Sequence, residues 1–433
     1  MFDFKEHVMH VLVDNGSYGM KNLGDIAMLQ VALLRLREFF PLAELHVLTT
    51  NPNRLLRYCP NVVPVPADVA IEGRSLWIQT WNVFGGLHRL LPRALGPRLQ
   101  LLENSLRTTH RRLVASWIVR RFTARGVNTE KMFQYLALVD SADCVVATGG
   151  GYLTDAFESH AAQVLSLLGL AQHAGLPTFL FGQGLGPLQS PWLLGLCRQV
   201  FPKLTFLGLR EGKASQPLAL SLGAASDRVS VTGDDAIEPA RSHVPQSLGN
   251  DIGVNLRVAN YSQVGEDLLG RVREVLHRVR TKHEVQLVPI PISHNVEDSD
   301  AATLEFLVGP GDENIASLDT PEKVILNVGK CRIVVTGSYH AGVFALSQGI
   351  QVVGLAKSPY YQDKFAGLAD QFKGGCQVVA MHEQNFPELL ESAMEEAWQA
   401  APVTREMLLA QAEAQVQASR QAWEKLKQAM GGR

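Results

Sequence analysis

The chain of 433 residues is too long for one hydrophobic core, and its 46% hydrophobic and 19% charged residues are typical of a soluble globular protein with two domains. The net charge of −2 supplies no positive field for a polyanion, which excludes general nucleic-acid binding. Five widely spaced cysteines without a CxxC pair indicate reduced core thiols and argue against a disulfide framework or a zinc site.

The N-terminal stretch is neither a signal peptide nor a membrane span, and no later stretch is long enough to cross a bilayer, so we expect a cytoplasmic protein. A predicted strand at 8–13 leads into a glycine-rich loop and an amphipathic helix. The glycine spacing is not that of a dinucleotide fingerprint. Asp25 begins the helix, where a carboxylate suits a sugar hydroxyl or simply stabilises the helix N-terminus.

Residues 67–135 interrupt the alternation of strands and helices with a basic helical insertion. Residues 74–131 contain ten arginines and one lysine but only two glutamates. Aromatic and apolar residues lie on one predicted helical face: Trp77, Trp81, Phe84, His88 and Leu91. Such a segment suits peripheral contact with an anionic membrane or a lipid-linked anionic substrate. Alternatively, the aromatic residues pack on the domain and the arginines are solvated.

Four predicted strands then follow, at 143–147, 178–181, 205–209 and 229–232, and each ends in a polar or glycine cluster. Because parallel strands share their carboxyl edge, these clusters should line a single cleft wall. The residues concerned are Gly149, Gly150, Gly151, Gln183, Arg210 and Asp234.

A linker at 238–251 separates a domain at 1–240 from a second α/β domain at 250–400. The strand at 252–256 runs into Arg257. Near the end of the second domain, a buried strand breaks at Gly337, and a helix starts near His340.

His340 should therefore lie at a helix N-terminus on the ligand-binding edge of a sheet, where an anion is favoured. The alternative is that His340 only caps the helix. From 403 to 433 the sequence is helical in period, and we expect this helix to pack back across the hinge.

Seven motifs occur together in order: GMKNLGDIAML, GGGYLTD, GQGLGPL, LREG, VTGDDA, IGVNLR and YHAGVFALSQGIQVVGL. In this respect the chain resembles the polysaccharide pyruvyl transferase family over nearly its whole length, apart from 67–135 and the tail. The resemblance implies an α/β fold with two Rossmann-like domains facing across a cleft, similar to the glycosyltransferase B architecture. It also implies transfer of a pyruvyl group from phosphoenolpyruvate to a sugar of a cell-surface polysaccharide or its lipid-linked precursor, forming a ketal.

Ketal formation at the enol carbon needs an acid and several anion-binding groups. His340 can serve as the acid, while Arg210 and Arg257 can hold carboxylate and phosphate, unless these arginines form only surface ion pairs. Nothing in this scheme needs a metal or a cofactor.

Members of the family usually carry an arginine two residues before the histidine, whereas this chain has Ser338 there, followed by Tyr339. Lys357 or Lys364 could replace the missing charge, and Tyr339 supplies only a hydroxyl. Two other classes stay open at this point. One is a glycosyltransferase-B-type enzyme that uses a nucleotide sugar, and the other is a noncatalytic glycan-binding protein.

Overall fold

The computed structural model describes residues 8–66, 68–78, 95–256, 266–294, 299–309, 314–356 and 358–431. Arg257 and Lys357 lie outside the described residues, as do Trp81, Phe84, His88 and Leu91 of the expected aromatic face. In the part of the chain that is described, no helix combines the length and apolarity needed to cross a membrane.

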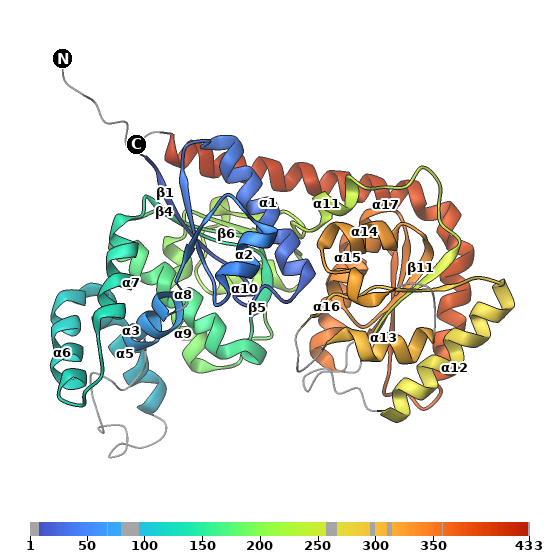
Figure 1. Cartoon of the computed structure of the whole chain (residues 1–433), viewed down its shortest axis with the longest axis horizontal. Coiled ribbons are helices and arrows are strands. Elements are labelled where there is room, and N and C mark those ends of the chain that lie inside the picture. Colours follow the sequence, from blue (N-terminus) through green and yellow to red (C-terminus); the bar gives the residue numbers. More distant parts are fainter. Residues whose placement is uncertain are drawn as a thin grey trace.

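The first half of the chain forms an eight-stranded parallel sheet with the order β3-β2-β1-β4-β6-β7-β8, with β5 beside β6 (Figure 1). Its strands are β1 (His10–Asp14), β2 (Glu44–Leu48), β3 (Val63–Val65), β4 (Cys144–Ala147), β5 (Gly150–Leu153), β6 (Thr178–Leu185), β7 (Phe206–Leu209) and β8 (Val229–Val231). Buried apolar residues cover β1, β4 and β6 on both faces, as a sheet between two helical layers requires.

The helices of this domain are α1 (Leu23–Phe39), α2 (Pro52–Tyr58), α3 (Arg74–Ile78), α5 (Gly96–Thr109), α6 (Arg111–Thr123), α7 (Glu130–Ser141), α8 (Glu158–His173), α9 (Pro191–Val200), α10 (Ser215–Ser221) and α11 (Ile237–Arg241). One face of the sheet packs on α7, α8 and α9, and the other packs on α1.

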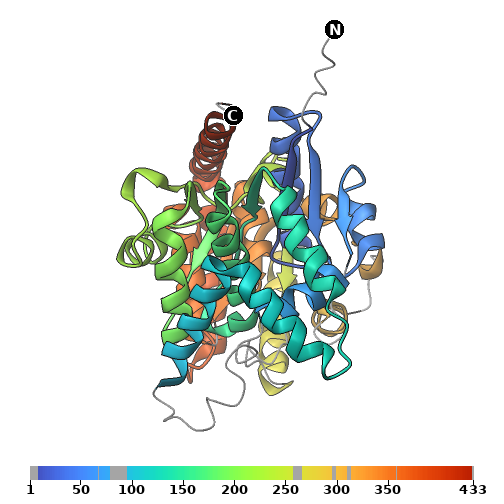
Figure 2. The same ribbon diagram turned by 90° about the vertical axis from the view of Figure 1, so that its left-hand side faces the viewer.

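The basic insertion forms α3, α5 and α6 and leads into α7, and these helices cross the front of the molecule in Figure 2. Trp77 is buried, in agreement with packing on the domain. Arg74 and Arg107 are also buried, so the expectation of solvated arginines is wrong at these two positions. Each is neutralised by a carboxylate, Arg74 by Asp14 and Arg107 by Glu103, because a buried charge is costly unless it is paired.

The second half forms a five-stranded parallel sheet with the order β10-β9-β11-β12-β13. Its strands are β9 (Asp251–Asn255), β10 (Leu287–Pro289), β11 (Cys331–Thr336), β12 (Gln351–Ala356) and β13 (Cys376–Ala380). The helices are α12 (Glu266–His283), α13 (Asp300–Val308), α14 (Pro321–Val328), α15 (Tyr339–Ser347), α16 (Pro359–Gln371) and α17 (Phe386–Met430).

The two sheets share a hydrophobic core, in which α1 and β1 of the first domain join α14 and α15 of the second. Helix α17 spans both domains, as Figure 1 shows, and Trp423 near its end stacks on Phe181 of β6 at 3.7 Å between ring centroids. The sequence predicts that this helix begins near residue 403, but it begins at Phe386. It continues through Pro402, although proline usually ends a helix.

Candidate active site between the domains

The loop after β1 joins the two domains directly. The Leu23 amide donates to the Ile292 carbonyl at 2.9 Å, and the His294 amide donates to the Lys21 carbonyl at 2.8 Å. Asn22, between these positions, caps α1 by accepting from the amides of Gly24 and Asp25. The glycine-rich loop is therefore fixed against the segment that follows β10.

A cavity of about 400 Å³ lies where the two domains meet. The first domain lines it with Lys21, Asp25, Gly151 and Arg210, among others. The second domain lines it with Ser293, Ser338, Tyr339, His340, Tyr360, Tyr361 and Lys364. The carboxyl edges of both sheets meet here, which is where open α/β sheets bind ligands.

His340 lies in the first turn of α15 and is 7% exposed, with its side chain on the cavity wall. Its Nε2 is 3.8 Å from Oδ2 of Asp234. Gly24 of α1 packs directly on the imidazole, since a Cβ added at Gly24 would lie 2.6 Å from Cβ of His340 and closer still to the ring. A glycine at position 24 is thus what lets the two domains approach around this histidine.

Arg210 follows β7 and is nearly buried, with its guanidinium 4.2 Å from the centre of the Tyr339 ring. Two glycines make room for it: a Cβ at Gly151 would lie 2.7 Å from Nη2, and one at Gly184 would lie 2.6 Å from Cζ. Burial by itself lowers the pKa of Arg210, but Tyr339 and Asp234 raise it, and the net shift is upward. The guanidinium therefore remains a fixed positive charge in the cavity wall.

Asp234 follows β8 but lies behind the cavity wall instead of lining it. Burial raises its pKa, whereas the nearby Arg210 lowers it. Its Oδ1 accepts from the Ala236 amide at 2.9 Å, and its Oδ2 lies 4.0 Å from Nη1 of Arg210. This carboxylate sits between the imidazole of His340 and the guanidinium of Arg210, which is the place of a positioning residue rather than of a substrate contact.

Three other residues expected to contact the substrate do not line this cavity: Gln183, Gly149 and Gly150. Gln183 is fully buried, and its side-chain amide donates to the carbonyls of Gly150 at 2.8 Å and Gly184 at 2.9 Å. Gly149 packs against the backbone of Gly182, where a Cβ would lie 2.7 Å from the carbonyl oxygen. Of the three consecutive glycines, only Gly151 lines the cavity. The others hold the turn after β4, because a strand end can present only some of its residues to the cleft.

Five of the sequence-predicted residues line the cavity with Arg210 and His340: Asp25, Gly151, Ser338, Tyr339 and Lys364. Ser338 occupies the cap position of α15 without a side-chain hydrogen bond to the first turn. Burial raises the pKa of Tyr339 well above its usual value, so its hydroxyl stays neutral. Nζ of Lys364 lies 4.2 Å from the centre of the Tyr360 ring.

The sequence is matched by the family model of polysaccharide pyruvyl transferases over residues 22–359, more than three quarters of the chain. The chain belongs to this family. It is therefore a transferase, and the resemblance seen in its motifs is confirmed. A comparison with curated protein sequences finds no significant match.

Solved structures support the fold of this family member. UDP-GlcNAc 2-epimerase from Neisseria meningitidis bound to UDP-GlcNAc superposes with a TM-score of 0.53 at 12% identity, covering 96% of this chain and 99% of that one. The S. aureus MnaA–UDP co-structure superposes with a TM-score of 0.56 at 13% identity, covering 95% of this chain and 94% of that one. Arabidopsis thaliana UGT89C1 complexed with quercetin superposes with a TM-score of 0.53 at 11% identity, covering 98% of this chain and 100% of that one. The predicted glycosyltransferase B architecture is confirmed.

Several residues that line the cavity of this pyruvyl transferase family member were not predicted from the sequence. Lys21 is the clearest, because it is the one basic residue inside the glycine-rich GMKNLGD motif. His160 of α8 also lines the cavity, and burial lowers its pKa to about 4, so it is neutral at physiological pH. Behind it, Arg74 of the insertion donates to Asp14 at 3.1 Å and to Gln163 at 2.8 Å. The insertion thus supports the cavity wall from within.

Proposed function

We propose that the chain transfers a pyruvyl group from phosphoenolpyruvate to a sugar of a cell-surface polysaccharide or its lipid-linked precursor, forming a cyclic ketal. The observation that carries the proposal is the meeting of His340 and Arg210, from different domains, in one cavity that Lys21 and Lys364 also line. Phosphoenolpyruvate carries a phosphate and a carboxylate close together, so it requires a compact cluster of cations. A cavity with an imidazole and three cationic side chains suits such a ligand.

Two cations lie close to Ser338, the position at which the family usually carries an arginine. The guanidinium of Arg210 lies over the ring of Tyr339, one residue along the chain from Ser338, and Lys364 approaches from α16. A Cβ at Gly151 would lie 2.7 Å from Arg210 Nη2 and 3.2 Å from Lys364 Nζ, so both cations reach the same point of the wall. We propose that this pair holds the donor carboxylate and phosphate in place of the family arginine.

The helix α15 adds a second source of anion binding. Its first-turn N–H groups have no carbonyl partner within the helix, and together with the helix dipole they favour a phosphate. The residue before the helix, Ser338, does not cap these groups with its side chain. We therefore propose that the donor phosphate binds beside His340.

Each step of the reaction then has a group to perform it. His340 donates a proton to the methylene carbon of phosphoenolpyruvate, which becomes a methyl group, and the cationic C2 is attacked by one acceptor hydroxyl. Phosphate leaves with its bonding electron pair, and a second hydroxyl of the same sugar closes the ketal. One hydroxyl proton restores His340, and the other leaves with the phosphate. Asp25, which also lines the cavity, accepts a hydrogen bond from the acceptor sugar.

We also propose that the protein is cytoplasmic and meets a lipid-linked acceptor at the inner membrane face through its insertion. On α6, Leu113 and Trp117 are 72% and 52% exposed and lie one helical turn apart. The exposed Arg112 and Arg120 flank them. An apolar pair beside arginines is the composition of an interfacial helix that binds anionic lipid.

A second candidate function is glycosyl transfer from a nucleotide sugar. It is favoured by the neighbours solved with UDP and UDP-GlcNAc, and by the helix N-terminus of α15, which suits a diphosphate as well. A noncatalytic glycan-binding protein is the third possibility, which the loss of the family arginine at Ser338 keeps open.

Thermal shift measurements with phosphoenolpyruvate, UDP-sugars and free glycans separate the three functions, because a ligand that binds the folded state raises the midpoint. We expect phosphoenolpyruvate to stabilise the wild type by about 2.7 kcal/mol at a hundredfold excess over Kd. Arg210→Gln should abolish this gain, whereas the matched variant Arg198→Gln, on the outer helix α9, should retain it. A shift with a UDP-sugar alone would support the glycosyltransferase, and a shift with glycans alone would support the noncatalytic binder.

A further inference from the structure

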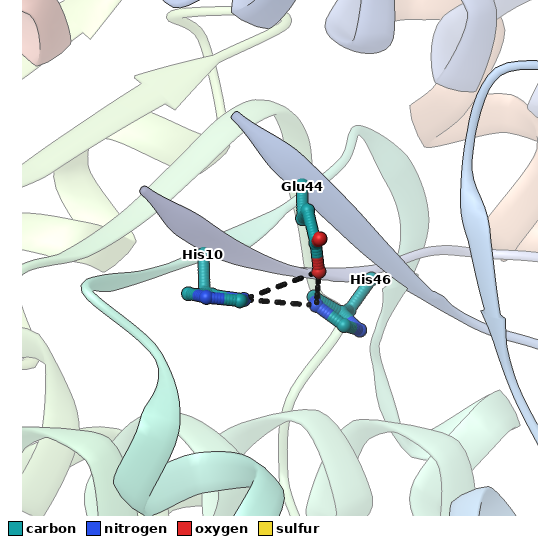
Figure 3. A group of neighbouring side chains, drawn as sticks. All are labelled: His10, Glu44 and His46. Carbon is teal, nitrogen blue, oxygen red and sulfur yellow. Dashed lines mark hydrogen bonds and ion pairs between the residues drawn. The ribbon is translucent and has the colours of Figure 1, made fainter. Parts of the chain in front are cut away.

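Three potential metal ligands meet at the amino end of the first sheet, on the edge opposite to the candidate active site. His10 begins β1 and pairs with Glu44, which begins the parallel strand β2. Side chains two residues apart in a strand share a face, so His46 stands on the same face as Glu44. Figure 3 shows the two imidazoles and the carboxylate converging on one point.

The distances among the three ligand atoms are those of a metal site. Nδ1 of His10 lies 3.2 Å from Nε2 of His46 and 3.5 Å from Oε2 of Glu44, and Nε2 of His46 lies 3.3 Å from the same oxygen. A tetrahedral zinc ion binds nitrogen and oxygen ligands at about 2.0–2.2 Å, which separates neighbouring ligand atoms by about 3.3–3.5 Å. An ion slightly out of the plane of this triangle would therefore meet all three atoms at about 2.0–2.2 Å without any strand having to move.

The backbone that carries these ligands is held in place. The His10 amide donates to Oδ2 of Asp143 at 2.7 Å, and the Asp143 amide donates to the His10 carbonyl at 2.8 Å. The pairing of β1 with β2 continues in register from His10 to Val13. The side chains of His10, Glu44 and His46 are 32%, 49% and 19% exposed, so an ion has a path of entry from solvent. The site is thus rigid in its backbone and open at its fourth position.

We propose that His10, Glu44 and His46 bind one divalent transition-metal ion of the zinc class, with solvent as the fourth ligand. Two imidazoles and one carboxylate are ligands that zinc accepts, and their number leaves one position open. Within the described residues, this is the one group of histidines, cysteines and carboxylates close enough together to hold an ion. The ion clamps β1 to β2 at the amino edge of the sheet and takes no part in pyruvyl transfer.

The test uses the full chain without a histidine tag, dialysed against a chelator and then against Zn²⁺, with bound zinc counted by mass spectrometry. We expect one zinc per chain and a higher unfolding midpoint with zinc. Bound Co²⁺ should show the visible absorption of a four-coordinate site. Loss of a hydrogen bond to a metal ligand typically lowers metal affinity by about 10- to 100-fold, and loss of the ligand itself should cost at least as much. We therefore expect His46→Ala and Glu44→Gln each to bind zinc at least about 10- to 100-fold more weakly than the wild type.

The matched control is His382→Ala, since His382 is an exposed histidine with Glu383 at 3.7 Å and has no third ligand in that group. It should leave zinc binding unchanged. Glu44 is half exposed, so Glu44→Gln preserves the fold and keeps the test valid if His46→Ala does not fold. Equal zinc uptake by wild type and Glu44→Gln, or no zinc-dependent rise in the wild-type midpoint, would overturn the proposal and leave a hydrogen-bonded cluster.

Discussion

Gly24→Ala changes no ionisable group and no residue of the cavity lining, yet it should disable the transferase. Gly24 lies in the first turn of α1 and packs on His340 of the opposite domain. The added methyl carbon would stand 2.6 Å from Cβ of His340, with the ring atoms closer still. Since ordinary contacts begin near 3.4 Å, the imidazole would have to retreat by roughly 1 Å.

The size of the effect follows from this displacement. A catalytic group misplaced by about 1 Å can cost about a hundredfold in rate, so we expect turnover to fall by about that factor. The free energy of unfolding should also fall, by an amount of the same order as the loss in transition-state stabilisation. Alanine favours a helix over glycine by up to about 1 kcal/mol, which partly offsets an overpacking cost of about 1–3 kcal/mol.

The assay compares turnover and unfolding midpoint of Gly24→Ala with those of Gly270→Ala. Gly270 is also helical, but a Cβ there would meet nothing within 4 Å. The control should therefore keep wild-type turnover and gain slightly in stability. Turnover within about threefold of wild type in a folded Gly24→Ala protein would refute the reasoning, because His340 would then have no need of its present position.

Three further predictions concern the acid, a buried carboxyl and the insertion. His340→Gln keeps a hydrogen-bond donor but cannot give up a proton, so turnover should fall by about a hundredfold at an unchanged unfolding midpoint, and near-normal turnover would make His340 a binding or capping residue. Burial raises the pKa of Asp235 from 3.8 to about 7, so the stability that its neutral form contributes is complete below about pH 4 and is lost as the pH rises through 7. As the pH rises from 5 to 8, the free energy of unfolding of Asp235→Asn should therefore increase relative to that of the wild type by about 2–3 kcal/mol, as measured by denaturant titration. A difference between the two proteins that does not change with pH would contradict this. Anionic vesicles should bind the wild type less as salt rises, because charges are screened beyond about 8 Å at physiological ionic strength. Trp117→Ala should weaken that binding while the equally exposed Leu326→Ala does not, and salt-independent binding would leave the exposed face of α6 without a membrane role.

The second domain shows which structural features can be predicted from local sequence patterns. The apolar run before Gly337 and the helix after it predict a strand, a turn and a helix, and β11 and α15 occupy those positions. Because the edge of a parallel sheet is fixed by the direction of its strands, the place of His340 also follows from the sequence. Arg210 is predictable in the same way, as the residue that directly follows β7.

Contacts that depend on the meeting of two domains are not visible in such patterns. The backbone bonds that place Lys21 and Ser293 in the cavity join segments far apart in the chain, and backbone groups carry no sequence signal. Gln183 lies within β6, beyond the end predicted for this strand, and its side chain turns inward to donate to the carbonyls of Gly150 and Gly184. The spacing of His10 and His46 likewise gives no motif, because strand register alone brings them together.

The sharpest test of the account follows the methylene carbon of the donor. Phosphoenolpyruvate labelled with ¹³C at this carbon would be incubated with the protein and the lipid-linked glycans of its source, and the product would be observed by NMR. We expect the methylene signal to become a ketal methyl signal, with one phosphate released per ketal, in the wild type and not in His340→Gln. An unchanged methylene signal, with a UDP-sugar consumed on the same glycans, would contradict pyruvyl transfer and establish the glycosyltransferase.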